Sequence, residues 1–502
     1  MTTGSVEAPR PPVADDKGRR ARPSWLFWAA GAPLAAGPAI LAFFGGGYGV
    51  TAQLLAAAVA FGVLGVLVAA SPWPLFGAPT AWVAVAALAG LAVWTGLSIA
   101  WARVLDDAAA ESAQLALYAA AFTACVIVLR HEPIRSAVPV ALLAGISLVA
   151  LYALAVRLLP SLFDIVFTAR AGERSEQPIG YWNALGLLMA LGMLLATAVA
   201  ADAERRLRFR SLATALAVPC ALMLYLTFSR GSLVALGAGY VALVLARPRR
   251  AVLLAGGLVL AAGALLALLL PLFPAVLEMD EGNATQTRQG ALLGCIVLAL
   301  TAAVGLSFAR LSAAPAWLRP LRPRREFRLA IALASVGAVI GVGWLIAFGD
   351  EVTEPLGSSG KRLTTLTTNR GAYWRVALDS LADHPATGVG AGSFAVEWRR
   401  ERTSSEFAVD AHSLPIETVG ELGMIGGGLL VAFFAAVVAG VIRRARDPGD
   451  GVVGAAAACI AASLVHFSLD WTWELPAVTL VFLVLAAAAV QPPAGATAPA
   501  RG

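Results

Sequence analysis

Five side chains have the chemical types needed to bind an anion and to move a proton: Arg230, Arg370, His412, Glu417 and Glu421. An arginine guanidinium keeps its charge and offers paired N–H donors to a phosphate or carboxylate. An imidazole changes protonation near neutral pH, so a histidine can act as a general base. The two glutamates are four residues apart and therefore share one face of a helix.

The polar segment that holds Arg370 and His412 has the signals of a folded loop. Residues 368–382 have the pattern of a helix, with Thr368 or Asn369 as its N-cap. Three glycines after this helix predict a tight backbone turn: Gly388, Gly390 and Gly392.

The composition shows what kind of scaffold must position these residues. Of the 502 residues, 59% are hydrophobic and 14% are charged, which is too little charge to cover a water-facing surface. Apolar runs of membrane-spanning length recur from Trp25 to Val490. The basic tail from Met1 to Arg22 has no small-residue cleavage site in the right place, so we expect the first run to be a retained helix. The sequence therefore predicts an all-α, polytopic membrane protein.

Fourteen membrane helices are expected. They lie at about 25–43, 50–70, 78–100, 111–130, 136–158, 181–200, 210–227, 229–246, 251–273, 289–309, 328–348, 413–441, 451–469 and 475–490.

The basic residues predict the orientation of these helices. With the N-terminus in the cytoplasm, 24 of the 37 Lys and Arg residues fall on the inner side. The outer side has 13, and 7 of those lie in one long loop at 349–412, so the short segments divide 24 to 6. This bias follows the positive-inside rule, in which long loops count little. Both termini are therefore expected in the cytoplasm and the long loop outside.

This topology divides the chain into six parts. They are a basic cytoplasmic tail (1–24), an N-terminal membrane bundle (25–180), a second membrane region (181–348), the external loop with most of the candidate chemistry (349–412), the C-terminal membrane helices (413–490) and a cytoplasmic tail (491–502).

Each candidate residue also has a purely structural interpretation. Arg230 lies in a turn too short to leave it free in water, so it needs a partner or extends to lipid headgroups. Arg370 could form an ion pair at a helix end, and His412 could cap the helix that follows it. Glu417 and Glu421 could neutralise nearby arginines.

The remaining charged residues of the loop favour structural roles. His384 precedes a proline and is expected to shape a turn. Four arginines are expected to contact water or lipid headgroups: Arg375, Arg399, Arg400 and Arg402. Of the other histidines, His131 is expected inside and His466 within or beside an apolar helix. At the outer mouth of the last two helices, His466, Asp470 and Glu474 could support a site or pair locally.

Several motifs in their order along the chain resemble the O-antigen ligase and polymerase family. The resemblance covers about 180–440 and is strongest at 365–428. The motifs are Ser-Arg-Gly at the start of a helix (229–231), Asn-Arg-x-x-x-Trp (369–374), His-Pro-x-x-Gly-x-Gly-x-x-x-Phe (384–394) and Ala-His-x-x-x-Ile-Glu-x-x-x-Glu-x-Gly (411–423). One departure is Ser413, where the family often has Asn, which leaves the subfamily open.

The resemblance implies glycan transfer from a polyprenyl diphosphate, usually undecaprenyl diphosphate, on the outer side of the cytoplasmic membrane, in a GT-C-type glycosyltransferase architecture. His412 would be the catalytic base that deprotonates the acceptor hydroxyl, with inversion at the anomeric carbon. Arg230 and Arg370 would bind the diphosphate and stabilise its growing charge. Arg375, Glu417 and Glu421 would support the site.

The implied partners are the lipid-linked glycan donor, a glycan, lipid or protein acceptor, and membrane lipids, with no metal, other cofactor or nucleic acid. Ligation, polymerisation of repeat units and protein glycosylation share this donor chemistry and stay open. A flippase or transporter is a rival, although it would place charges along a path in mid-membrane and show repeated halves. A metal-dependent transferase is another rival, for which Asp106 and Asp107 are the candidate acids.

Overall fold

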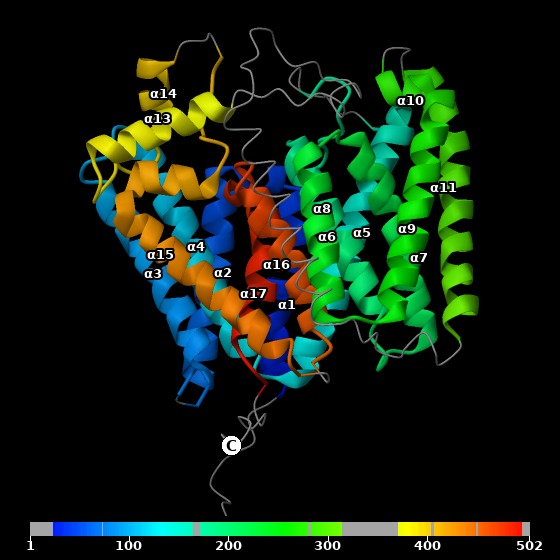
Figure 1. Cartoon of the computed structure of the whole chain (residues 1–502), viewed down its shortest axis with the longest axis horizontal. Coiled ribbons are helices and arrows are strands. Elements are labelled where there is room, and N and C mark those ends of the chain that lie inside the picture. The colour runs from blue at the N-terminus through cyan, green and yellow to red at the C-terminus, as the bar shows by residue number, and fades with distance from the viewer. Residues whose placement is uncertain are drawn as a thin grey trace, which may run out of the picture.

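The computed structural model describes residues 24–72, 74–163, 171–279, 283–313, 370–402, 406–447 and 450–493. Within these ranges the chain folds into sixteen α-helices and four short 3₁₀ turns (Figure 1). The all-α fold class is confirmed, because the long apolar runs have no partner for their backbone groups in lipid except within a helix.

Ten of the helices are long and apolar enough to cross a membrane. They are α1 (Ser24–Ala42), α2 (Val50–Ala70), α3 (Pro79–Ser98), α4 (Leu105–Val128), α5 (Glu132–Leu158), α6 (Trp182–Ala200), α7 (Leu207–Leu226), α9 (Arg250–Leu269), α11 (Asn283–Ser312) and α15 (Leu414–Arg444). Three shorter apolar helices are α8 (Arg230–Ala246), α16 (Val453–Phe467) and α17 (Pro476–Val490). The protein is thus a polytopic membrane protein.

Ten of the fourteen predicted spans coincide with the helices of membrane-spanning length, and three more coincide with the shorter apolar helices α8, α16 and α17. The remaining predicted span, 328–348, lies outside the described residues. The positions of these helices were predictable because a run of apolar residues is a local property of the chain.

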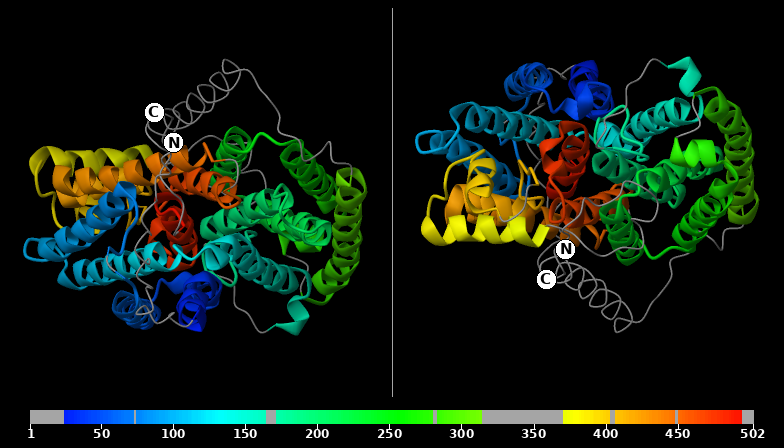
Figure 2. Two further views of the ribbon diagram at one scale, coloured as in Figure 1. Left: turned by 90° about the horizontal axis from the view of Figure 1, so that it is seen from below. Right: turned by 90° about the horizontal axis from the view of Figure 1, so that it is seen from above.

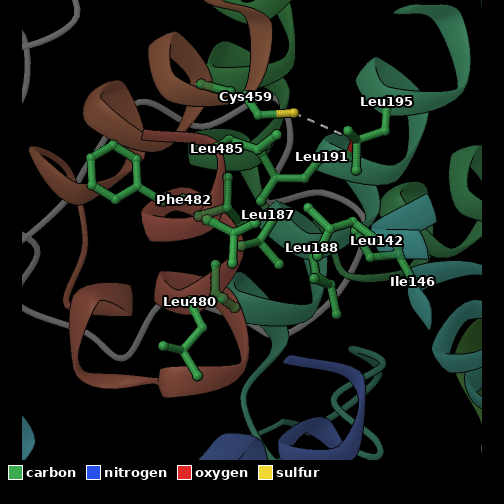
Figure 3. Close-up of a cluster of buried hydrophobic side chains, with 14 of the residues drawn as sticks. Leu142, Ile146, Leu187, Leu188, Leu191, Leu195, Cys459, Leu480, Phe482 and Leu485 are labelled. Carbon is green, nitrogen blue, oxygen red and sulfur yellow. Dashed lines mark hydrogen bonds between the residues drawn. The ribbon is translucent and has the colours of Figure 1, made fainter. Parts of the chain in front are cut away.

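The centre of the bundle is α6, whose membrane window is 100% buried, whereas α2 and α11 are 17% and 28% buried. Leucines of α6 pack with side chains of α5, α16 and α17, as Figure 3 shows. Close approach depends on small residues, as at Gly192, which faces Ile146 and Cys220. Because the membrane helices are apolar on nearly all faces, composition alone does not tell which one is central.

At one end of the bundle, two helices lie over α3, α4 and α15. They are α13 (Arg370–Asp383) and α14 (Phe394–Glu401), which occupy the upper left of Figure 1. The helix predicted at 368–382 is confirmed as α13, although its expected caps lie outside the described residues. The sequence reading did not include α14, a short amphipathic helix.

The opposite end of the bundle is held by arginines that cap the C-termini of helices. Arg135 is buried and donates to the Gln491 carbonyl at 2.9 Å and to Asp450 at 2.8 Å. Arg249 donates to the Ala201 carbonyl at 3.0 Å, just after α6. The last carbonyls of a helix lack partners within the helix, so guanidinium groups stabilise them.

The short elements complete the described fold. One is the helix α10 (Pro274–Glu278), and the 3₁₀ turn η6 (Thr472–Glu474) connects α16 and α17. The other 3₁₀ turns are Gly45–Gly47, Pro160–Leu162 and Leu270–Leu272. Seen from above in Figure 2, α17 (red) lies between the blue helices α3 and α4 on one side and the teal and green helices of the middle of the chain on the other.

Candidate active site

The predicted glycine turn is confirmed and docks against α15. Gly388 and Gly390 have φ angles of 64° and 94°, which side chains with a Cβ rarely adopt. A Cβ on Gly388 would run into the backbone of Glu421, and one on Gly390 into Ala102. The Gly390 N–H donates to the Glu421 carbonyl at 2.8 Å, next to Gly423, where α15 departs from helical geometry. The glycines therefore fasten the segment between α13 and α14 to the kink of α15.

The carboxylate of Glu421 holds the start of α14. It accepts hydrogen bonds from the backbone N–H groups of Phe394 at 2.7 Å and Gly392 at 3.0 Å. Glu417 likewise accepts from the backbone N–H of Ala411 at 2.9 Å. The shared helix face expected for the two glutamates therefore points toward the segments before α14 and α15, and in the described residues both carboxylates accept from backbone N–H groups.

His412 occupies a constrained turn immediately before α15. Its φ of 56° lies in the left-handed region, an unusual conformation for a residue with a Cβ that recurs at functional sites. The imidazole stacks on Tyr373 of α13, with ring centroids 5.6 Å apart and an interplanar angle of 22°. Its side chain is 25% exposed, and Nδ1 lies 3.7 Å from Asp470 Oδ1. The ring is thus oriented from both sides while it stays reachable.

Asp470 connects His412 with Arg370. The carboxylate is only 3% exposed, and Arg370 Nη2 donates to its Oδ2 at 2.6 Å. Two further donors come from the start of α6: Tyr181 Oη reaches Oδ1 at 2.7 Å, and Asn183 Nδ2 reaches Oδ2 at 2.7 Å. The Trp471 N–H completes the set at 2.9 Å.

The charge state of Asp470 follows from this environment. Burial by itself would raise its pKa, but the Arg370 guanidinium and the His412 imidazole hold the pKa well below its usual range. Asp470 is therefore a carboxylate at any physiological pH, and it can accept hydrogen bonds from both candidate site residues.

Arg230 begins α8 and is anchored to the same region through its neighbours. Ser232 Oγ lies 3.1 Å from His466 Nε2 and donates to the Asn183 carbonyl at 3.2 Å. On its other side, His466 Nδ1 lies 2.9 Å from Thr472 Oγ1. The turn that carries Arg230 is thus linked by hydrogen bonds to the segment that carries Asp470.

Arg375 and His384 lie apart from this arrangement. Arg375 is exposed on α13, and its five-residue offset from Arg370 places it about 140° away around the helix. His384 is exposed, its N–H donates to the Ser380 carbonyl, and its carbonyl accepts from Gly388, which fits the turn-forming role expected for it. Arg400 is exposed and pairs with Glu397 at 3.3 Å.

Two acidic groups beside the site have pKa values near neutrality. Burial raises the pKa of Asp410 to about 7, against the opposing effect of His412. Burial also raises the pKa of Glu474 to about 8, with Asp410 and Glu421 adding to the shift. In the part of the chain that the structure describes, the His, Cys, Asp and Glu side chains form no group of three or more that could hold a metal ion.

Sequence reasoning noted Asp470 only as a residue near the outer mouth of a helix, and it missed Tyr181, Asn183 and Tyr373. A polar pair at the start of an apolar run was the available signal for Tyr181 and Asn183. Their partner lies almost 300 positions later, so the pairing itself has no local signature.

Comparison with known families bears on the later part of the chain. Residues 282–431 match the family model described as O-antigen ligase, which confirms the resemblance for the motifs at 369–423. The Ser-Arg-Gly motif at 229–231 lies outside the match. The match includes α11, α13, α14 and the first part of α15, and hence Arg370, His412, Glu417 and Glu421. No curated protein matches the chain.

Proposed function

From the O-antigen ligase domain at residues 282–431 of this membrane protein, we propose that the chain is a glycosyltransferase. It transfers a glycan from a polyprenyl diphosphate to a hydroxyl acceptor on the outer side of the cytoplasmic membrane, with inversion and without a metal. The observation that carries the proposal is the buried Asp470 carboxylate, which accepts from Arg370 at 2.6 Å and lies 3.7 Å from His412. It couples an anion-binding group to a proton acceptor.

In the proposed mechanism, His412 removes the proton from the acceptor hydroxyl as its oxygen attacks the anomeric carbon. The bond from that carbon to the diphosphate oxygen breaks, and the diphosphate leaves with the electron pair. Arg370 and Arg230 bind the diphosphate and stabilise the charge that develops on it. The ionised Asp470 stabilises the imidazolium formed on His412 through Nδ1, which lies nearest to Oδ1.

The supporting residues act by position in this proposal. Glu417 fixes the backbone just before His412, and Glu421 fixes the turn that leads into α14. Arg375, exposed on α13, would contact the headgroup or glycan of the donor. We further propose that both termini are cytoplasmic and that the segment 349–412 is external, in a GT-C-type arrangement.

The test is turnover of an undecaprenyl diphosphate-linked glycan by purified protein. His412→Ala should lose about 10²–10⁴-fold in rate, the range for a general base. His384→Ala is the matched control, because this second histidine of the same segment is exposed and makes only backbone hydrogen bonds in the described structure. It should keep turnover. Wild-type rates in His412→Ala, with unchanged thermal stability, would remove the base assignment.

The diphosphate-binding assignment has its own test. Arg370→Lys and Arg230→Lys keep the charge but lose the planar fork, and each should impair transfer. Arg400→Lys is the control, because Arg400 is exposed and pairs with Glu397. Full activity of Arg370→Ala would discard the diphosphate-binding role.

Repeat-unit polymerisation is the alternative within the same chemistry. The acceptor would then be a second lipid-linked glycan, and the product would be a ladder of lengths instead of one transferred unit. Repeated turnover with one lipid-linked donor and no other acceptor distinguishes the two, because only polymerisation then gives a ladder of products.

A further inference from the structure

The start of α6 bears two polar side chains that contact the Asp470 carboxylate on different oxygens. Tyr181 is the N-cap residue of α6, in extended conformation after Gly180, and Asn183 is the second residue of the helix. Tyr181 Oη donates to Oδ1 at 2.7 Å, and Asn183 Nδ2 donates to Oδ2 at 2.7 Å. Asn183 Nδ2 also lies 2.8 Å from Tyr181 Oη, so the two donors form one network.

The two carboxylate oxygens serve different partners. Oδ2 receives Arg370 at 2.6 Å, and Oδ1 is the oxygen nearest His412, at 3.7 Å. Rotation of the carboxylate about its Cβ–Cγ bond would take both oxygens out of line with these partners. Donors fixed on both oxygens oppose that rotation, because Tyr181 holds one oxygen and Asn183 holds the other.

Both donors are themselves held rigidly. The ring of Tyr181 packs between Trp182 and Trp471, at centroid distances of 4.9 and 4.5 Å. The backbone carbonyl of Asn183 accepts from Ser232 of α8 at 3.2 Å. Since α6 lies at the centre of the bundle, the donors have a fixed reference frame.

We propose that Tyr181 and Asn183 are positioning residues that lock the Asp470 carboxylate, so that Oδ2 orients the anion-binding Arg370 and Oδ1 orients the proton acceptor His412. The inference rests on the proposed function for the meaning of these roles, but the locking itself does not. Through Ser232, Asn183 also connects this carboxylate to the turn that carries Arg230.

The geometry predicts different effects for the two residues. Oδ1 already accepts from Tyr181 and from the Trp471 N–H, which leaves His412 at 3.7 Å. Removing the Tyr181 hydroxyl frees a lone pair of Oδ1 for the His412 N–H. The other titratable groups around this carboxylate are Arg370, His412 and His466, with Asp410 beside His412. None of these is altered by Tyr181→Phe.

Tyr181→Phe should therefore change the ring ¹⁵N chemical shifts of His412, because its Nδ1–H gains an acceptor in Oδ1. The shifts are measured at one pH by NMR of histidine-labelled full-length protein in detergent, with the signal assigned by His412→Gln. Tyr240→Phe is the matched control, because it removes a buried tyrosine hydroxyl that bonds only Thr197 among the described contacts. It should leave the His412 shifts unchanged.

Asn183→Asp keeps the shape of the side chain but replaces the donor to Oδ2 by a second carboxylate. It should weaken the binding of undecaprenyl diphosphate by at least about tenfold, because Arg370 is drawn toward two negative charges. If Asn183→Asp does not fold, Asn183→Ser provides the same readout with a smaller loss of binding.

Turnover separates this inference from the proposed function. If the His412 ring shifts change as expected but the wild-type protein transfers no glycan, the proposed function fails and the positioning role stands. Unchanged His412 ring shifts in folded Tyr181→Phe protein overturn the inference whatever the turnover, and so does unchanged binding of the diphosphate by folded Asn183 variants.

Discussion

Asp470→Asn is the substitution that most directly tests the arrangement of the site. The carboxylate accepts four hydrogen bonds of 2.6–2.9 Å, from Arg370, Asn183, Tyr181 and the Trp471 N–H. An amide has one acceptor oxygen, so its NH₂ group must face two of these donors. The asparagine side chain of Asn183 can turn over and the tyrosine hydroxyl can rotate, but the Arg370 guanidinium and the Trp471 N–H can only donate. The amide oxygen should face Arg370, the charged donor, so its NH₂ group should face Tyr181 and His412 and leave the Trp471 N–H without this acceptor.

The magnitude follows from the charge that is lost. A hydrogen bond to a charged group contributes about 1.5–3 kcal/mol, and Arg370 is 20% exposed, so solvent screens part of the interaction. The NH₂ group would also favour the His412 tautomer that accepts at Nδ1, which leaves the wrong nitrogen to take the acceptor's proton. We expect a loss of about 2–3 kcal/mol of transition-state stabilisation, which is roughly 30- to 150-fold in kcat/KM.

The assay is glycan transfer by purified protein, with thermal stability measured beside it. Asp379→Asn is the matched control, because Asp379 is an exposed carboxylate on the same helix as Arg370. Because the pKa of Asp470 is held well below its usual range, the carboxylate stays ionised above about pH 4. The ratio of wild-type to variant rates should thus be similar at pH 6 and pH 8. A kcat/KM within threefold of wild type, in folded protein, would refute the coupling role of Asp470.

Three further predictions concern the scaffold and the topology. Gly390→Ala should lower the free energy of unfolding by about 1–3 kcal/mol, because φ at this residue is 94° and the new Cβ meets Ala102. Gly428→Ala is the control, because a Cβ there meets open space, and it should leave the stability unchanged. Thermal unfolding in detergent measures both. Burial raises the pKa of Glu474 to about 8, so the folded state retains a proton that the unfolded carboxylate releases above about pH 4, and stability falls as pH rises toward 8. Glu474→Gln should therefore reduce the difference in melting temperature between pH 5.5 and pH 8, and an unchanged difference would argue against the shift. A cysteine introduced at Ser358 should react with an impermeant reagent in intact cells, and labelling only after permeabilisation would contradict the external position of the loop.

The sequence by itself determined the membrane spans and the chemical types at the site. Hydropathy is a property of contiguous residues, so the limits of α2 (Val50–Ala70) and α6 (Trp182–Ala200) were predicted to within a residue or two. The glycine turn was also predictable, because positive φ angles at Gly388 and Gly390 favour glycine for local steric reasons. His412 and Arg370 were found through their motifs, which the O-antigen ligase family match confirms for that segment.

Only the tertiary structure decided what these residues contact. Glu421 could have faced arginines, but the docked loop brings the backbone N–H groups of Gly392 and Phe394 to its carboxylate. Asp470 lies 100 positions from Arg370 and 289 from Tyr181 in the sequence, yet it accepts hydrogen bonds from both. Apolar helices give no sequence signal for their neighbours, because lipid covers any face that protein does not. The packing of α6 against α8 and α16 therefore determines which polar side chains meet, and the linear pattern cannot.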